Sequence, residues 1–302
     1  MLRASFAITL LGVTGCAVEP TTGTRASAII GGELASPDDF PSVVALETTP
    51  GDWFCTGTLI APQWILTAAH CVDGAPVSMV KVRFGDPDVN DDAGGTVVPA
   101  AEIHAHPGFD WEAWDDDVAL VKLATPVTDR APTPIHREVV AAGTQVLDVG
   151  YGVADNNDNG GGLLRKVGKT TADCAGANDP GISGANLLCM DASDGRGSCF
   201  GDSGGPTFAT VGGKLVVAGI TSGGTGELCG AGWDLYTSVH GELDYIDMIL
   251  GASPEPSDPD PTDPTPDPTG DGGDGGGCSA GGGTSGAGLL GLALILRRRR
   301  SR

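Results

Sequence analysis

Short apolar runs separated by turn residues fill the chain from Ile29 to about Thr237. Val, Ile and Leu are enriched in the runs, whereas Gly, Pro, Asp and Asn separate them, a pattern typical of β-strands joined by turns. Many short strands with regular breaks predict an all-β sandwich or barrel. The runs that we expect as strands are Ser42–Glu47, Gly57–Ile60, Val80–Phe84, Val118–Leu123, Gln145–Val149 and Leu215–Ile220.

One helix is predicted at the end of this region. Ser238 is a candidate N-cap, and Gly251 stands where a helix would stop. Apolar residues between them recur at helical spacing and would share one face. These residues are Val239, Leu243, Ile246 and Leu250.

The first 28 residues predict export. A positively charged start and a short apolar run are typical of a signal segment over residues 1–16. Its last four residues, Val-Thr-Gly-Cys, resemble the lipobox of bacterial lipoproteins, in which the Cys, here Cys16, is lipidated. An ordinary signal peptide with a Cys near its cleavage site is the alternative. Residues 17–28 are small and polar, and we interpret them as a pro-segment.

The composition changes abruptly after Gly251. Residues 252–277 alternate Pro with acids and then become Gly-rich, so they predict an extended linker that cannot bury a core. Residues 278–302 hold Cys278, an apolar run shorter than the roughly 20 residues of a spanning helix, and an arginine cluster. This order resembles the sorting tails of myxobacterial surface proteins, which implies attachment at the bacterial cell surface or outer membrane. The alternative is a weakly apolar tail without a sorting role.

Charge and cysteine content narrow the function classes. The formal net charge of −22 argues against nucleic acid as a partner, because nucleic-acid binding needs clustered Lys and Arg. The acidity favours a basic substrate or only keeps an exported protein dispersed. None of the eight cysteines forms a CxxC pair, so a zinc site is not expected. Cys16 and Cys278 lie in the export-like segments, and the inner six could form three disulfides.

Three separated motifs indicate nucleophilic catalysis. Ser203 lies in the glycine-rich stretch Gly-Asp-Ser-Gly-Gly, where backbone N–H groups can converge to bind an oxyanion. Such a serine needs a base, and His70 stands beside Cys71 after a strand-like run. The other four histidines, His106 among them, have no comparable setting and are expected at the surface. Asp117, the last of three consecutive aspartates, heads a buried apolar strand, where a carboxylate needs a partner.

These motifs, in this order, resemble the chymotrypsin/trypsin family of serine proteases from Ile29 to about Leu250. The segment Ile-Ile-Gly-Gly at 29–32 is similar to the family's mature N-terminus, and Gly150-Tyr151-Gly152 matches a family turn. Ser222-Gly223-Gly224 matches its substrate-binding strand. The resemblance implies a protease domain over 29–251, with two six-stranded antiparallel β-barrels, the active site between them, and a C-terminal helix.

The resemblance also implies roles. Ser203 would be the nucleophile, His70 the base and Asp117 its orienting acid, with the N–H groups of Gly201 and Ser203 as the oxyanion hole. The enzyme would cleave peptides or proteins without a cofactor. A pseudoprotease used as a binding module is the alternative, but such proteins usually lose a triad member. The implied disulfides are Cys55–Cys71, Cys174–Cys189 and Cys199–Cys229.

Activation by proteolysis is the next implication. Cleavage before Ile29 would free an ammonium that pairs with the buried carboxylate of Asp202. The bond to be cut follows Ala28 rather than Arg or Lys, which departs from the usual trypsin-type site and leaves the activating protease open.

Substrate preference and calcium stay open at this stage. Alignment within the family places Gly197 at the base of the P1 pocket, where trypsins carry Asp, and Gly224 on one wall. Asp234 falls on the opposite wall, where it could pair with a basic P1 side chain, or else it points to solvent. The loop Asp86–Thr96 resembles the calcium loop of some relatives, and a solvated acidic loop is the alternative.

Overall fold

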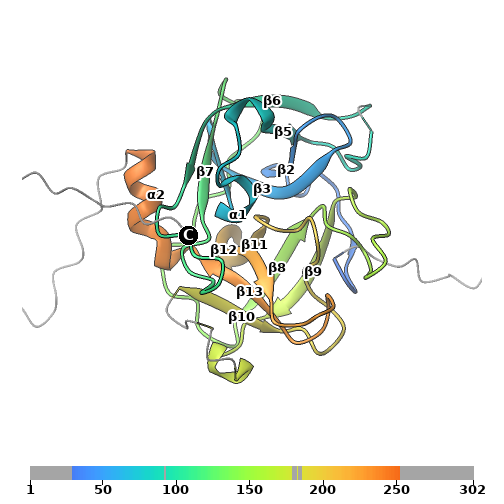
Figure 1. Ribbon diagram of the computed structural model, residues 1–302, viewed down its shortest axis with the longest axis vertical. Coiled ribbons are helices and arrows are strands. Elements are labelled where there is room, and N and C mark those ends of the chain that lie inside the picture. Colours follow the sequence, from blue (N-terminus) through green and yellow to red (C-terminus); the bar gives the residue numbers. More distant parts are fainter. Residues whose placement is uncertain (1–28, 92, 179–181, 183–185, 252–302) are drawn as a thin grey trace, which may run out of the picture. The chain divides into compact units, whose positions relative to one another are not determined.

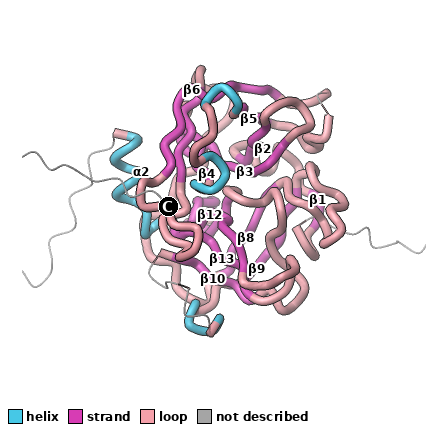
Figure 2. Tube along the Cα trace, viewed as in Figure 1, coloured by secondary structure: helices cyan, strands magenta, loops and turns pink. Residues whose placement is uncertain are grey.

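The computed structural model describes residues 29–91, 93–178, 182 and 186–251. The predicted signal segment, pro-segment, linker and tail, with Cys16 and Cys278, lie outside the described residues. Among the regular elements of the described chain, strands outnumber helices (Figure 2). None of its helices is long and apolar enough to cross a membrane.

The N-terminal half forms a closed six-stranded barrel, as predicted. Its strand order is β2-β3-β4-β7-β6-β5, and neighbouring strands are antiparallel. These strands occupy the upper part of Figure 1. Their bounds are β2 Val43–Glu47, β3 Trp53–Ala61, β4 Trp64–Thr67, β5 Lys81–Phe84, β6 Thr96–Ala105 and β7 Ala119–Leu123.

The C-terminal half forms a seven-stranded antiparallel sheet in the order β1-β9-β8-β11-β12-β13-β10. It differs from the expected six strands because the short β1, near the N-terminus of the described chain, pairs with β9 at the edge. Both halves consist mainly of antiparallel strands, which confirms the all-β class. The strands are β1 Glu33–Leu34, β8 Gln145–Gly150, β9 Arg165–Thr170, β10 Leu187–Asp191, β11 Pro206–Val211, β12 Lys214–Gly224 and β13 Trp233–Ser238.

The predicted C-terminal helix is present but starts later than expected. A 3₁₀ turn, η3 (His240–Glu242), precedes α2 (Leu243–Leu250), so Ser238 is not its N-cap. Gly251 ends the helix in the left-handed conformation, with its backbone N–H directed at carbonyls of the last turn. The remaining helical segments are α1 Ala69–Val72, η1 Val77–Met79 and η2 Cys174–Ala177.

One apolar cluster fills the first barrel, and another joins the two halves. One fills the first barrel with alternating inward residues such as Leu59, Ile65 and Val121, all fully buried. The other combines Leu66 of the barrel with Phe208 of the sheet and Ile246 of α2. Each such side chain contributes roughly 1.5–3 kcal/mol through burial. Because the second cluster has members from both halves, it fixes the junction at which their loops meet.

Three disulfides brace this frame, with the pairing that the resemblance implies: Cys55–Cys71, Cys174–Cys189 and Cys199–Cys229. They close short loops of 15 to 30 residues. Disulfides of this kind typically contribute about 2–4 kcal/mol each. The first joins β3 to α1, and the third holds the segment that precedes Ser203.

Candidate active site

Strand pairing brings His70 and Asp117 together. Thr67 at the end of β4 pairs with Ala119 at the start of β7. His70 lies three residues after Thr67, in α1, and Asp117 lies two residues before Ala119. Both side chains therefore leave the same end of one strand pair. The disulfide of the neighbouring Cys71 restrains α1 in addition.

Asp117 binds His70 through both carboxylate oxygens. Its Oδ2 lies 2.7 Å from His70 Nδ1, and its Oδ1 accepts the His70 backbone N–H at 2.8 Å. Asp117 is only 1% exposed, and Ser222 Oγ also donates to Oδ2, at 2.6 Å. A carboxylate facing Nδ1 favours the tautomer with the proton on that nitrogen. The lone pair of Nε2 is then left available as a base.

Ser203 reaches this place from the other half of the molecule, in the turn before β11. The backbone N–H of Thr56 in β3 donates to the Ser203 carbonyl at 2.8 Å. Thr56 follows Cys55, which is the disulfide partner of the residue after His70. Gly204, the residue after Ser203, has a φ of +78°. A Cβ at this position would overlap Thr67 Oγ1, so only glycine fits. Contacts across the junction thus place Ser203 opposite the His70 loop.

The peptide before Gly201 is oriented for anion binding. The carbonyl of Phe200 accepts the N–H of Val153 at 2.8 Å. Because a trans peptide is planar, the Gly201 N–H of the same peptide points the opposite way. Thr56 Oγ1 holds the following carbonyl, that of Gly201, at 2.8 Å. The Gly201 φ of +94° requires this glycine. Together with the Ser203 N–H, this geometry can hold an oxyanion.

Asp202 is a buried carboxylate behind the serine. It is 2% exposed, and its oxygens accept the N–H groups of Gly152 and Cys199 at 2.8 and 2.9 Å. Burial raises the pKa of Asp202 to about 7 in spite of these hydrogen bonds. Ile29 is also buried, with 1% of its surface exposed. The carbonyl of Ile30 accepts the backbone N–H of Gly197 at 3.0 Å. A buried carboxylate of this kind calls for a cation.

A cavity of about 240 Å³ opens beside Ser203. Of the residues expected to bind substrate, Ser222, Gly224 and Asp234 line this cavity, whereas Gly197, expected at its base, does not. Gly224 pairs with Asp234 across β12 and β13. Asp234 is 4% exposed and accepts the Ser198 N–H at 3.2 Å, so its carboxylate faces inward rather than to solvent. Burial, reinforced by the charge of Asp148, raises its pKa to about 7.

Two tryptophans of the cavity wall were not identified from the sequence. Trp111 packs its ring at 5.1 Å from the His70 ring centroid, and the Trp111 and Trp114 rings lie 5.1 Å apart. Both line the cavity. The available signal was two tryptophans, three residues apart, just ahead of the aspartate run. Trp111, although half exposed, thus packs against the His70 ring, and Trp114 packs against Trp111.

A buried polar network behind the cavity was also missed. Asp148 in β8 accepts Thr207 Oγ1 at 2.6 Å and the Tyr236 hydroxyl at 2.8 Å. Burial raises the pKa of Asp148 to about 6. Lys169 Nζ donates to the carbonyl of Arg196, directly before Gly197, at 2.6 Å. The negative charge of Asp148 raises the pKa of Asp234, whereas the positive charge of Lys169 lowers it.

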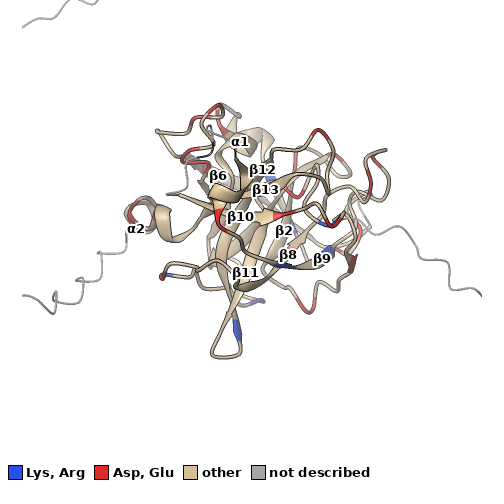
Figure 3. Ribbon diagram, turned by 90° about the horizontal axis from the view of Figure 1, so that it is seen from below, with Lys and Arg blue, Asp and Glu red and all other residues tan. Residues whose placement is uncertain are grey.

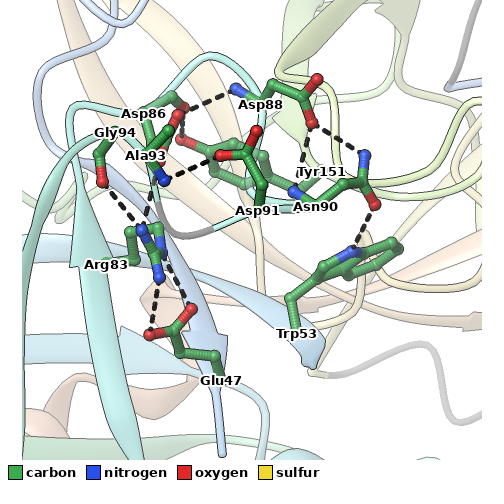
Figure 4. A network of polar contacts seen from close by, with 10 residues as sticks. All are labelled: Glu47, Trp53, Arg83, Asp86, Asp88, Asn90, Asp91, Ala93, Gly94 and Tyr151. Atoms are coloured by element: carbon green, nitrogen blue, oxygen red, sulfur yellow. Dashed lines mark hydrogen bonds and ion pairs between the residues drawn. The ribbon is translucent and has the colours of Figure 1, made fainter. Parts of the chain in front are cut away.

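The acidic loop Asp86–Thr96 is organised around an arginine (Figure 4). The guanidinium of Arg83, 1% exposed, binds Glu47 at 2.8 Å, Asp86 at 3.3 Å and the Gly94 carbonyl at 2.8 Å. Arg83 thus binds two oxygens of this loop, Asp86 Oδ2 and the Gly94 carbonyl, that a calcium ion there would compete for.

Acidic side chains lie on loops at several places on the molecule (Figure 3). Within the described residues, two groups of metal-ligating side chains converge. Cys55, His70 and Cys71 form one, but the two cysteines are joined in a disulfide and offer no thiolates. The other comprises His106, Asp116 and Glu242.

Comparison with known proteins agrees with this geometry. The family model described as trypsin matches residues 29–249. Brachyurin of Leptuca pugilator is 34% identical over 235 residues, covering 75% of this chain and 100% of that protein. Trypsin of Sus scrofa is 31% identical over 234 residues, covering 74% and 96%. Serine protease 1 of Rattus norvegicus is 33% identical over 234 residues, covering 74% and 91%. The family match begins at Ile29, after the predicted pro-segment.

Proposed function

The chain belongs to the trypsin family of serine endopeptidases, and from this premise we propose that it hydrolyses peptide bonds through Ser203, His70 and Asp117. The observation that carries the assignment is the double contact of Asp117 with His70 at the edge of the cavity that Ser203 lines. Ser222, bonded to the same carboxylate, supports it.

The proposed reaction has two halves. Ser203 Oγ attacks the substrate carbonyl while His70 Nε2 takes its proton, and His70 then protonates the departing amine. The N–H groups of Gly201 and Ser203 stabilise the oxyanion. Water attacks the acyl-enzyme in the same way, and its hydrogen atoms are divided between the new carboxyl group and the regenerated serine. Asp117 orients the imidazole and stabilises its charged form.

Cleavage of a peptide library by material with a verified Ile29 N-terminus tests this function. The active chain should release peptides, whereas the Ser203→Ala variant should not. Equal cleavage by both would assign the activity to a contaminant.

Activation by cleavage before Ile29 is part of the proposal. Its supports are the burial of Ile29, the hydrogen bond from Gly197 to the following carbonyl, and the buried carboxylate of Asp202. A new α-ammonium at Ile29 would offset the cost of burying the Asp202 charge. The activating protease must accept Ala28 before the cleaved bond.

We infer that Asp234 selects a basic P1 side chain from the side of the cavity, while the lack of a carboxylate at Gly197 also admits apolar ones. The inference rests on the burial of Asp234 and its place in the cavity lining. A charged hydrogen bond in such a desolvated place is stronger than one at the surface.

Secretion and attachment at the bacterial surface are proposed from the sequence alone, since both ends lie outside the described residues. Deleting residues 278–302 should release soluble, active enzyme. Retention of that truncated chain in the membrane fraction would exclude the tail as anchor.

We also infer that the Asp86–Thr96 loop holds its shape without calcium, because Arg83 supplies the positive charge inside it. Adding calcium should therefore leave the melting temperature unchanged. A calcium-dependent rise would contradict this view.

A further inference from the structure

Three side chains from distant parts of the chain meet on the far side of the Asp117 segment. His106 follows β6, Asp116 lies in the loop before β7, and Glu242 ends η3 just before α2. One ligand atom from each lies within 4.8 Å of the other two. None of the three has a role in the proposed mechanism.

The cluster is held from all sides. The Nδ1 atom of His106 lies 3.2 Å from Asp116 Oδ2. The His106 ring packs edge-on against Tyr245 of α2, with centroids 4.3 Å apart. Asp116 adopts a left-handed φ of +54°, which turns its side chain away from that of Asp117. His106, expected at the surface, is half-buried, with its side chain 20% exposed.

Glu242 carries the strongest signal. The residue is 2% exposed, and its Oε1 is buried without a hydrogen-bond partner among the described residues. It occupies the N-cap position of α2, but its side chain makes no capping hydrogen bond. A buried carboxylate oxygen without a partner is costly. The helix N-terminus lowers this cost only in part.

The cluster has more acceptors than donors. The backbone N–H of Gly108 lies 3.1 Å from His106 Nδ1, so a metal ion bound at Nδ1 would replace this hydrogen bond. Asp116 Oδ2 and Glu242 Oε1 are acceptors as well, and Asp115 adds further negative charge nearby. A positive charge among them would satisfy all three at once. Among the described residues, no Lys or Arg forms an ion pair with the cluster.

We propose that His106, Asp116 and Glu242 bind a divalent transition-metal ion of the zinc class. One imidazole and two carboxylates are a ligand set suited to Zn²⁺, and they leave a fourth position for water. Ligand atoms around such an ion lie roughly 3.4 Å apart, given bonds of about 2.0–2.2 Å. The observed spacing therefore needs only a small closure. Asp116 and His106 are half-buried, so the ion can enter from solvent.

An ion bound by these residues would link the segment that holds Asp117 to the C-terminal helix. Asp116 adjoins Asp117 directly, and Glu242 is followed by α2. An ion bound to both would stabilise the folded chain by mass action. The proposal does not depend on the peptidase assignment, because its readout is metal binding.

The test is a calorimetric titration of the full chain, carrying Ser203→Ala to prevent self-digestion and freed of metal beforehand. We expect a saturable Zn²⁺ site with a dissociation constant in the micromolar range or below, and no such site for Mg²⁺. Glu242→Gln and His106→Gln should each weaken this site by tenfold or more, since even outer-shell partners of a metal are worth roughly 10- to 100-fold.

The matched control is His104→Gln. His104 also faces a carboxylate, Glu102, at 3.0 Å, but the pair belongs to no three-ligand group. The zinc affinity of the His104→Gln variant should equal that of the parent chain. Zinc bound at His70, Cys16 or Cys278 would be insensitive to Glu242→Gln, and that result would overturn the proposal. So would the absence of saturable zinc binding by the parent chain. If the Glu242→Gln variant fails to fold, the zinc affinity of the His106→Gln variant tests the proposal in its place.

Discussion

The carboxylate of Asp234 packs directly against the backbone of Gly197, because a Cβ built on Gly197 would overlap the Oδ2 atom of Asp234. Gly197 is not among the residues that line the cavity but backs the Asp234 carboxylate, so an aspartate at that position would require Asp234 to move. In this chain the carboxylate stands on the wall, fixed by the Ser198 N–H.

Removing the wall carboxylate should change specificity more than activity. Asp234→Gly is expected to lower kcat/KM for Arg substrates by about 10- to 100-fold relative to Leu substrates, the value of one charged hydrogen bond. Gly197→Asp alone should be damaging because of the overlap with Asp234. The double variant should regain preference for Arg. An unchanged Arg/Leu ratio in Asp234→Gly would remove this residue from P1 recognition.

The preference should also depend on pH. The raised pKa of Asp234, about 7, means that its carboxyl is neutral below that pH and charged above it. The ratio of kcat/KM for Arg over Leu substrates should therefore rise with pH through about 7. Titrations common to both substrates cancel in this ratio. Asp148, Lys169 and Asp202 are the charged groups that act on Asp234. Asp234→Gly should give a flat ratio, and a sloping one there would point to another group.

Asp117, rather than its neighbour Asp116, should be the essential acid. Asp117→Asn is expected to cut kcat by about 10⁴-fold, because an amide would favour the wrong tautomer of His70. Asp116→Asn, measured without added metal, should have a small effect, since this side chain faces His106. Thermal melting of both variants checks that folding is intact. A larger loss in Asp116→Asn would reverse the assignment.

Activation should require Asp202. Asp202→Asn is expected to stay nearly inert even after cleavage before Ile29, because the new ammonium would lose its charged partner. Sequencing the N-terminus of active material is the accompanying check. Active enzyme that began at Ala17 or Ala26 would contradict the account.

The catalytic motifs could be recognised from sequence because each is local. Ser203, His70 and Asp117 stand in short, distinctive settings whose family order is informative. The strands were predicted where Val, Ile and Leu gather in a short run, as in Val43–Glu47, whose five residues are all buried. Strand β9, with the sequence Arg-Lys-Val-Gly-Lys-Thr, escaped prediction because its long polar side chains hide the alternation.

Other features depend on tertiary contacts that no local pattern encodes. Lys169 would ordinarily be placed in solvent, yet it is buried and bonded to backbone carbonyls beneath the cavity. Asp148 lies within an apolar strand, and its partners Thr207 and Tyr236 are far away in sequence. His106 gains its significance only because η3 places Glu242 beside it.

The most direct test of the central claim is labelling with a fluorophosphonate, which reacts with an activated serine, followed by mass spectrometry of the digested protein. Chain with a verified Ile29 N-terminus should carry one adduct, on Ser203, and Ser203→Ala should carry none. His70→Ala should also abolish labelling, because the base would be missing. Correctly processed chain that stays unlabelled, or an adduct that persists in Ser203→Ala, would contradict the account.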